Sequence, residues 1–232
     1  MDNLIEFKNV YKNFGDKQVL KDVNFTIKSN KIIGLIGQNG SGKTTIFKLI
    51  NDLLTPTSGE ILVCGNPIGV ESKKQISYLP ERTYFDKYTS IEDALVFFET
   101  FYDDFDRNKA EQLLKDLDID KSQSMEKMSK GMKEKIQLAI VMSRHTKLYI
   151  LDEPLGGVDP ATRDYILDTI LTNFNEGASI IISTHLISDI ERILDEVIFI
   201  DKGEIKLISD ADELRNKENA SIDEIFRRMF KC

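Results

Sequence analysis

Residues 37–44 read Gly-Gln-Asn-Gly-Ser-Gly-Lys-Thr and directly follow an apolar run at residues 32–36. The eight residues match the pattern G-x-x-x-x-G-K-S/T, which is typical of phosphate-binding loops between a strand and a helix. Three glycines leave room for backbone N–H groups to approach phosphate oxygens, and the N-terminus of the next helix favours an anion. The alternative is a glycine-rich turn without a ligand, which the flanking strand and helix disfavour.

Two side chains of this loop add charge and a hydroxyl. Lys43 supplies a point charge to the outer phosphates of a nucleotide, and the Thr44 hydroxyl is a ligand for Mg²⁺. The sequence therefore predicts a nucleotide site built from a continuous segment, consisting of Gly37, Gln38, Asn39, Gly40, Ser41, Gly42, Lys43, Thr44 and Thr45.

Strands and helices alternate on both sides of the loop. The first 80 residues have the apolar alternation of strands, interrupted by one helix from Thr44 to about Leu54. A helical segment follows from Ser90 to Arg144, and strands then alternate with helices that begin at Pro160 and Leu186. This order predicts an α/β fold with a mostly parallel sheet. The predicted strands are residues 4–7, 19–27, 32–36, 61–63, 76–79, 147–151, 178–183, 197–200 and 204–208.

The helical segments carry recognisable start signals. Ser90 and Asp106 are predicted N-caps of two helices, and Ser129 is a predicted N-cap of a third over residues 130–143. Residues 221–231 place apolar side chains at helical spacing, which predicts a small amphipathic helix. We expect that helix to pack on its own domain rather than on a membrane.

Four predicted strands end in groups that nucleotide hydrolysis requires. These groups are the loop at residues 37–44, Glu81, the pair Asp152 and Glu153, and His185. In a parallel sheet the carboxyl ends of the strands lie at one edge, where such folds bind ligands. The sequence therefore predicts a single site assembled from distant segments.

The acidic pair and the histidine suggest specific chemistry. Asp152 is expected to hold Mg²⁺ or its water shell, and Glu153 is the candidate general base beside the terminal phosphate. The alternative is that both acids cap the next element. His185 could reach the terminal phosphate and the attacking water, although a lone histidine is more often structural. His145 lacks such a context and is interpreted as structural.

Composition excludes several classes of protein. The 232 residues are 41% hydrophobic and 30% charged, as in soluble globular proteins. Their net charge of −8 has the wrong sign for a protein whose main partner is nucleic acid or anionic lipid. No run approaches the roughly 20 apolar residues of a membrane span, and the N-terminus lacks a secretory signal, so the cytosol is expected. Cys64 and Cys232 are too few for a disulfide framework and are interpreted as free thiols.

The motifs, taken in order, resemble those of the nucleotide-binding subunits of ABC transporters over nearly the whole chain. The matching segments are an A-loop-like Lys12-Asn13-Phe14-Gly15, the Walker A loop at residues 37–44, a Q-loop-like Tyr78-Leu79-Pro80-Glu81, a signature-like Met128-Ser129-Lys130-Gly131-Met132, a Walker B segment at residues 148–153, a D-loop-like Gly157-Val158-Asp159-Pro160, and a switch histidine in Ser183-Thr184-His185.

The resemblance implies a P-loop NTPase fold of the RecA-like type, with an N-terminal antiparallel β subdomain and an inserted α-helical subdomain. Residues 1–232 would form one ABC ATPase domain. Its nucleotide-binding core, with the β subdomain, would comprise residues 1–81 and 146–209. The helical signature subdomain would be residues 82–145, and a C-terminal helical tail residues 210–232.

The resemblance also implies a role for each group in the site. Phe14 would stack on adenine, since an aromatic ring matches the flat apolar face of the base. The residues that carry hydrolysis would be Lys43, Glu153 and His185. The cofactor would be Mg²⁺, bound with ATP, and its ligands would be Thr44, Glu81 and Asp152.

A second subunit would complete the site. At the predicted cap Ser129, a hydroxyl and the positive end of a helix face outward together, an arrangement that suits an anion, although a simple capped helix is the alternative. The resemblance implies that this segment does not reach its own phosphate loop and instead closes over ATP on a second ATP-binding subunit, in a homo- or heterodimer. The residues acting on that partner's ATP would be Ser129, Lys130, Gly131, Met132 and Asp159.

The implied function is ATP hydrolysis that drives a separate transmembrane permease, with export of a drug or peptide expected. The chain would be peripheral, on the cytoplasmic face of the cell membrane, and would not bind nucleic acid. Residues 101–106 resemble a branch associated with antibiotic response and peptide export.

Two departures from the family pattern leave alternatives open. Glu81 stands where glutamine is common and adds negative charge, and Lys130-Gly131-Met132 replaces Gly-Gly-Gln. A non-catalytic ATP-binding assembly subunit is therefore one alternative. A soluble ABC ATPase acting on ribosomes or DNA is another, disfavoured by the single motif set, the absence of heptads and the acidic charge. A GTPase is disfavoured because residues 108–111 only approach the guanine-reading pattern Asn-Lys-x-Asp.

The helical subdomain is rich in aromatic residues, more than one buried helix face requires. We hypothesise that this surface and the loop after Glu81 receive a short cytoplasmic helix of a membrane subunit. Core packing alone is the competing interpretation. The residues concerned are Leu95, Phe97, Phe98, Phe101, Tyr102 and Phe105.

Overall fold

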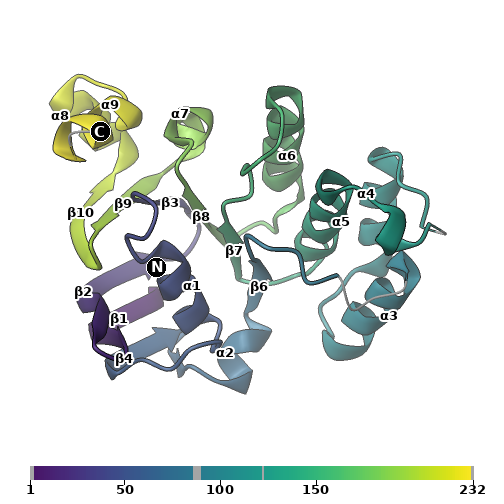
Figure 1. The fold of residues 1–232 in the computed structure, drawn as a ribbon, viewed down its shortest axis with the longest axis horizontal. Helices are drawn as coiled ribbons and strands as arrows, with labels where there is room; N and C mark the ends of the chain where they lie inside the picture. Colours follow the sequence, from purple (N-terminus) through teal and green to yellow (C-terminus); the bar gives the residue numbers. More distant parts are fainter. Residues whose placement is uncertain (1–2, 86–89, 122, 231–232) are drawn as a thin grey trace.

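A computed structural model describes residues 3–85, 90–121 and 123–230 of the chain. Figure 1 shows a small sheet at the lower left, a larger sheet through the middle, and a group of helices at the right-hand end of the long axis. None of the described helices has the length and apolar character needed to cross a bilayer.

The small sheet is the predicted antiparallel β subdomain, which is confirmed. It contains β1 (Asn3–Phe14), β2 (Lys17–Lys28), β4 (Ser58–Val63) and β5 (Asn66–Pro67), in the order β2-β1-β4-β5, and every described pair is antiparallel. Apolar residues alternate along β2 because successive side chains point to opposite faces of a sheet. Those that face inward are buried, namely Leu20, Val23, Phe25 and Ile27.

The larger sheet is the predicted mostly parallel sheet, which is also confirmed. Its order is β10-β9-β3-β8-β7-β6, and among its described strand pairs only the hairpin between β9 and β10 is antiparallel. The strands are β3 (Ile32–Ile36), β6 (Ile76–Leu79), β7 (Leu148–Asp152), β8 (Ser179–Thr184), β9 (Glu196–Asp201) and β10 (Glu204–Asp210).

Both faces of the central strands of the larger sheet are buried. In β7, Leu148 and Ile150 pack with the small sheet and the first helix, whereas Tyr149 and Leu151 pack under the other helices. A strand covered on both faces is apolar along its whole length. This explains why residues 147–151 and 178–183 read as continuous apolar runs.

Two predictions about the helices of the N-terminal half were wrong in detail. Helix α1 (Lys43–Ile50) does not continue to Leu54, because Asp52 has φ 55, a left-handed conformation that a right-handed helix does not contain. A second helix, α2 (Val70–Lys74), interrupts the strands where only one helix was predicted. It is too short for a 3.6-residue period to appear in the sequence.

The helical group contains α3 (Ile91–Phe101), α4 (Arg107–Asp116), the 3₁₀ turn η2 (Met125–Lys127) and α5 (Lys130–Met142). The three predicted caps are present: the side chains of Ser90, Asp106 and Ser129 each accept a hydrogen bond from the third residue beyond them. Each cap satisfies a backbone N–H that the helix itself leaves unpaired.

Arg144 fixes the helical group to the larger sheet. Its side chain is only 3% exposed, and Nε and Nη2 donate to the two carboxylate oxygens of Asp104, both at 2.9 Å. The same guanidinium donates to the backbone carbonyls of Ile76 at the start of β6 and of Lys74 at the end of α2, and it lies over the ring of Tyr102. The turn between α3 and α4 is therefore held at the amino end of β6, opposite the predicted ligand edge.

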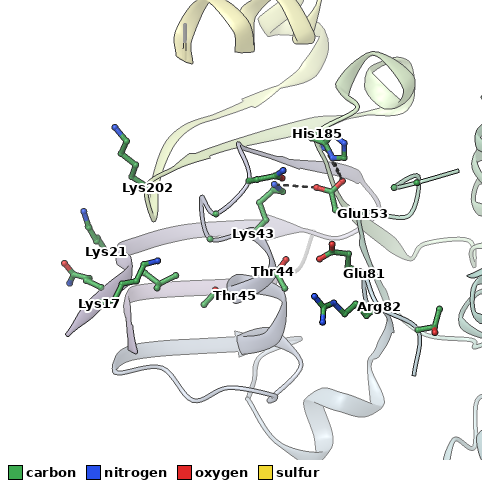
Figure 2. A pocket seen from close by; sticks show the side chains of 18 of the residues that line it. Lys17, Lys21, Lys43, Thr44, Thr45, Glu81, Arg82, Glu153, His185 and Lys202 are labelled. Atoms are coloured by element: carbon green, nitrogen blue, oxygen red, sulfur yellow. Dashed lines mark hydrogen bonds and ion pairs between the residues drawn. The ribbon is translucent and has the colours of Figure 1, made fainter. Parts of the chain in front are cut away.

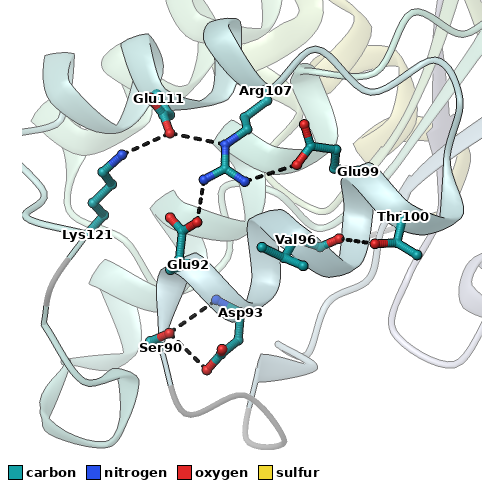
Figure 3. A network of polar contacts seen from close by, with 9 residues as sticks. All are labelled: Ser90, Glu92, Asp93, Val96, Glu99, Thr100, Arg107, Glu111 and Lys121. Atoms are coloured by element: carbon teal, nitrogen blue, oxygen red, sulfur yellow. Dashed lines mark hydrogen bonds and ion pairs between the residues drawn. The ribbon is translucent and has the colours of Figure 1, made fainter.

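Arg107 cross-links α3 and α4 on the surface of the helical group (Figure 3). The guanidinium donates to Glu92 at the start of α3, to Glu99 further along it at 3.0 Å, and to Glu111 on its own helix at 3.2 Å. Lys121 adds a second bond to Glu111, at 2.9 Å. Hydrogen bonds to these carboxylates raise the pKa of Arg107 above its ordinary value.

Replacing Arg107 by methionine should lower the free energy of unfolding by about 1 kcal/mol, since a network of charges on a partly exposed arginine exceeds a single surface pair but is screened by water. Urea denaturation at low salt and in 1 M NaCl would measure it, and the difference should shrink in high salt. Arg227→Met, which removes the single ion pair with Asp223 that is found for Arg227 among the described residues, is the control and should change stability by less than about 0.5 kcal/mol. Equal effects of the two substitutions would show that the Arg107 network adds nothing to the free energy of unfolding beyond a single surface ion pair.

The C-terminal segments pack on the same domain, as predicted. After α6 (Pro160–Asn173), α7 (Ile187–Ile190) and the 3₁₀ turn η3 (Glu191–Ile193), the chain ends in α8 (Ala211–Glu218) and α9 (Ile222–Phe230). The apolar face of α9 is buried against the sheet through Phe226, whose ring lies edge-on to Phe199 with centroids 5.4 Å apart.

Candidate active site

A pocket of about 1290 Å³ opens at the carboxyl ends of the parallel strands (Figure 2). The structure brings together at this edge the phosphate loop, Glu81 after β6, Glu153 after β7 and His185 after β8. Asp152 is buried beneath them at the end of β7. The predicted convergence of distant segments is therefore present in the fold.

The phosphate loop requires glycine at two positions for different reasons. Gly42, just before α1, has φ +117, a conformation that other residues rarely adopt. At Gly37, a Cβ atom would lie 2.4 Å from the carbonyl oxygen of Ile200 on β9, so a side chain cannot fit there. These two glycines let the loop pass close to β9 at Gly37 and take up a left-handed turn at Gly42, a geometry that suits a phosphate-binding loop.

Lys43 is folded back onto this loop. The side chain is 5% exposed, and Nζ donates to the carbonyl oxygens of Gly37 at 2.8 Å and Gln38 at 3.4 Å. Nζ also lies 3.6 Å from Oε1 of Glu153. The ammonium group is thus held at the floor of the pocket, where an anionic ligand would meet it.

Glu153 occupies the centre of the site. Its backbone has φ 50, unusual for this residue type, and its N–H donates to the carbonyl and hydroxyl oxygens of Ser183 at 3.0 and 3.1 Å. Oε2 accepts hydrogen bonds from the backbone N–H of His185 at 3.3 Å and from Nδ1 of the same residue at 2.8 Å. The carboxylate therefore lies between Lys43 and His185 (Figure 2).

The surroundings of Asp152 fit a hard cation. Ser183 donates to Oδ1 at 2.5 Å, while Oδ2 is buried and has no hydrogen-bond partner within the described part of the chain. Burial raises the pKa of Asp152, and hydrogen bonding by the Ser183 and Thr44 hydroxyls opposes that rise. Glu81 lines the same pocket as Thr44. Carboxylate and hydroxyl oxygens near one another are the ligands that Mg²⁺ takes in proteins.

Several basic residues of the pocket were missed in the sequence. The six cationic side chains among its described lining residues contrast with the acidic chain as a whole, and they are Lys17, Lys21, Lys43, Arg82, Lys130 and Lys202. Lys17 and Lys21 come from the start of β2, and Lys202 from the turn between β9 and β10, which is joined to β2 by a hydrogen bond from the N–H of Lys21 to the carbonyl of Gly203 at 2.9 Å. Lys43 and Lys130 were predicted from their motifs, but no local motif marks Lys17, Lys21 or Lys202, because only strand packing brings these three residues together.

Phe14 lies outside the pocket lining in the structure. Its side chain is 47% exposed at the end of β1, and Nζ of Lys12 lies 4.9 Å from the centre of its ring. The ring is therefore on the surface and available to a flat partner, but no described contact links it to the phosphate loop.

The signature segment is placed partly as expected. Ser129 caps α5 by accepting from the N–H of Met132 at 3.2 Å, and it is exposed. Lys130, in contrast, lines the same-chain pocket and approaches Gly157, although this segment was expected not to reach its own phosphate loop. The long side chain of Lys130 extends from the start of α5 to this pocket, which the sequence motif alone does not reveal. Asp159 caps α6 and is exposed.

Comparison with known proteins identifies the family. The family model described as "ABC transporter" matches residues 20–156. The chain is 33% identical over 218 residues to the ABC transporter ATP-binding protein YtrB of Bacillus subtilis (strain 168), covering 92% of this chain and 74% of that protein. It is 30% identical to the Nod factor export ATP-binding protein I of Rhizobium sp. (strain N33), covering 86% and 68%.

A solved ATP-binding subunit of an ABC transporter superimposes with a TM-score of 0.87 at 29% identity, covering 98% of this chain and 99% of that chain. The fold, the order of the motifs and the sequence matches agree. The chain belongs to the ABC transporter family, as an ATP-binding ATPase subunit related to those of bacterial export systems.

Proposed function

We propose that this chain binds Mg-ATP in the pocket at the sheet edge and hydrolyses it between two ATP-binding subunits, and that this drives a separate transmembrane subunit. The position of Glu153 between Lys43 and His185 carries the proposal. The carboxylate of Glu153 lies next to the ammonium of Lys43, which would bind phosphate, and next to His185, which orients the carboxylate. The basic pocket lining in an acidic chain further favours a polyanionic ligand.

The chain's own groups each have a defined task. The loop from Gly37 to Thr45 binds the phosphates through N–H groups, and Lys43 exchanges its contacts with loop carbonyls for phosphate oxygens. Glu153 accepts a proton from the attacking water. An ionised carboxylate only accepts hydrogen bonds, so Nδ1 of His185 carries the proton of the 2.8 Å contact and fixes the direction of the carboxylate.

The metal would be held by Thr44, Glu81 and Asp152, whose free Oδ2 atom suits a cation or its bound water. When bound, Mg²⁺ supplies positive charge to the phosphates. Glu81, in place of the common glutamine, adds a second carboxylate to this side of the site.

The proposed partners are a second ATP-binding subunit and a membrane permease. Ser129, Gly131, Met132 and Asp159, together with Lys130, would contact ATP held by a second subunit, and Phe14 would stack on adenine. In this proposal residues 1–81 and 146–209 form the core, 82–145 the signature subdomain and 210–232 the tail. The permease would hold the chain at the cytoplasmic face of the membrane, and the cargo would be exported, as the name of the Nod factor relative suggests.

The exposed side of α3 is the proposed contact with the permease. Leu95 and Phe98 are buried, whereas Phe97 and Phe101 are 38% and 67% exposed, and their rings lie 4.5 Å apart. Tyr102 and Phe105 are partly buried against the core. Core packing therefore explains only part of the aromatic content. Of the loop after Glu81, residues 86–89 lie outside the described residues.

The variant Phe101→Asp should abolish binding of the chain to the membrane subunit and its stimulation of ATPase activity, because a charge in an apolar contact is strongly unfavourable. The basal ATPase rate of the isolated chain should stay within about twofold of the native rate, as at most surface sites. The control is Ile208→Asp, which puts the same charge at an exposed apolar residue on β10, at the opposite end of the molecule from α3 (Figure 1). This variant should still bind the membrane subunit. Unchanged assembly of Phe101→Asp would remove α3 from the contact.

A phosphate-release assay on the purified chain tests the proposed function. Turnover of ATP that requires Mg²⁺ and is lost on adding EDTA is expected. Binding of ATP without turnover, with and without the membrane partner, would instead favour the non-catalytic assembly subunit, the alternative that Glu81 and Lys130-Gly131-Met132 keep open.

A further inference from the structure

The loops that follow β7 and β8 run side by side and are joined where they leave the sheet. Asp152 pairs with Ser183 in the parallel ladder, and the next residues are linked by the hydrogen bonds of Glu153 to Ser183 and His185. The first loop continues to Asp159 and helix α6. The second continues from His185 into α7.

Arg163 joins the same two loops a second time, at their far ends. On α6, its Nε donates to the carbonyl of Val158 at 3.2 Å, and its Nη1 donates to Oδ2 of Asp189 on α7 at 2.9 Å. Its backbone N–H donates to the carbonyl of Asp159 at 3.0 Å. The side chains of Arg163 and Asp189 are 28% and 29% exposed, so the pair is partly shielded from water. A planar guanidinium holds both acceptors from two nitrogens in a fixed geometry, whereas the donors of a lysine all lie on one nitrogen at the end of a flexible side chain.

The segment that carries Asp189 is anchored on both sides of that residue. Ile187 and Ile190, on either side of Asp189, are buried. Beyond them, the carboxylate of Glu191 accepts a hydrogen bond from the N–H of Asp223 at 3.1 Å, which fixes η3 to the C-terminal helix α9. Asp189 therefore lies in an anchored short helix, α7, which begins two residues after His185.

We propose that Arg163 is a positioning residue that ties the turn at residues 157–159 to the segment carrying His185. The inference rests on the proposed function, in which a second subunit contacts Asp159. Because the two loops are joined at both ends, contact of the partner with this turn sets the orientation of His185 and so of Glu153. Without Arg163, the far ends separate while the joint between Glu153 and His185 remains.

The test is a double-mutant cycle with Arg163→Met, Asp189→Asn and the double variant, measured as ATPase kinetics of the purified chain. Each single variant should lower kcat about tenfold and leave KM for ATP within about twofold, since misplaced groups affect the reaction more than the binding. The double variant should be no slower than either single variant, because both remove the same link. Arg163→Lys should restore little of the rate.

Arg192→Met is the matched control, since Arg192 on η3 lines a surface pocket together with Arg163 and Asp189. It should retain the native kcat, and thermal unfolding of all variants should show them folded at the assay temperature. Additive losses in the cycle, a kcat within twofold of native, or a loss in KM that accounts for the whole effect would each overturn the positioning role. A native chain without any turnover would contradict the proposed function, and the inference with it.

Discussion

The Glu153→Gln variant is expected to bind ATP but to hydrolyse it at least about 100-fold more slowly than the native chain, since a general base contributes a factor of about 10²–10⁴. Glutamine has the same size and can still accept a hydrogen bond from His185, but an amide does not take up the proton of the attacking water. The substitution also removes a negative charge 3.6 Å from Nζ of Lys43, so the ammonium group attracts the phosphates more strongly.

Slow hydrolysis should also trap the proposed dimer. Light scattering during gel filtration in Mg-ATP should show twice the subunit mass for Glu153→Gln and a smaller dimer fraction for the native chain. Glu176→Gln, an exposed residue before the amino end of β8, is the control and should keep native turnover. Unimpaired phosphate release by Glu153→Gln would reject the assignment of the general base.

The Lys43→Ala variant should lose most of its affinity for ATP, by about 100-fold or more, because charge-assisted hydrogen bonds to an anion are worth about 1.5–3 kcal/mol each. The fluorescence of a labelled ATP analogue, titrated with protein, would measure the change. The buried ammonium also donates to the carbonyls of Gly37 and Gln38, so alanine removes a group that holds the loop in shape.

Lys48 provides a close control for this substitution. It lies on the same helix α1 but is exposed and outside the pocket lining. Lys48→Ala should bind the analogue as the native chain does. Native affinity in Lys43→Ala, with the protein folded, would remove Lys43 from the phosphate site.

The sequence predicted those parts of the site that follow directly from local pattern. The phosphate loop has its own motif, and Glu81, Glu153 and His185 each follow an apolar run whose parallel pairing brings its end to the same edge. The caps Ser90, Asp106 and Ser129 could also be predicted, because a cap depends only on a residue and its next turn.

What could not be predicted depends on packing between distant segments. Lys202 reaches the pocket because the turn between β9 and β10 is hydrogen-bonded to β2, a contact between residues far apart in the chain. The end of α1 depends on a left-handed Asp52, and the link from Arg163 to Asp189 depends on two loops from different strands lying together. None of these has a signal in the residues beside it.

Calorimetric titration of the native chain with ATP in the presence of Mg²⁺ tests the central claim most directly. The account predicts saturable heat with one nucleotide bound per chain, weakened when Mg²⁺ is removed because Thr44, Glu81 and Asp152 then lack their cation. A folded chain that takes up no adenine nucleotide under these conditions would contradict the account.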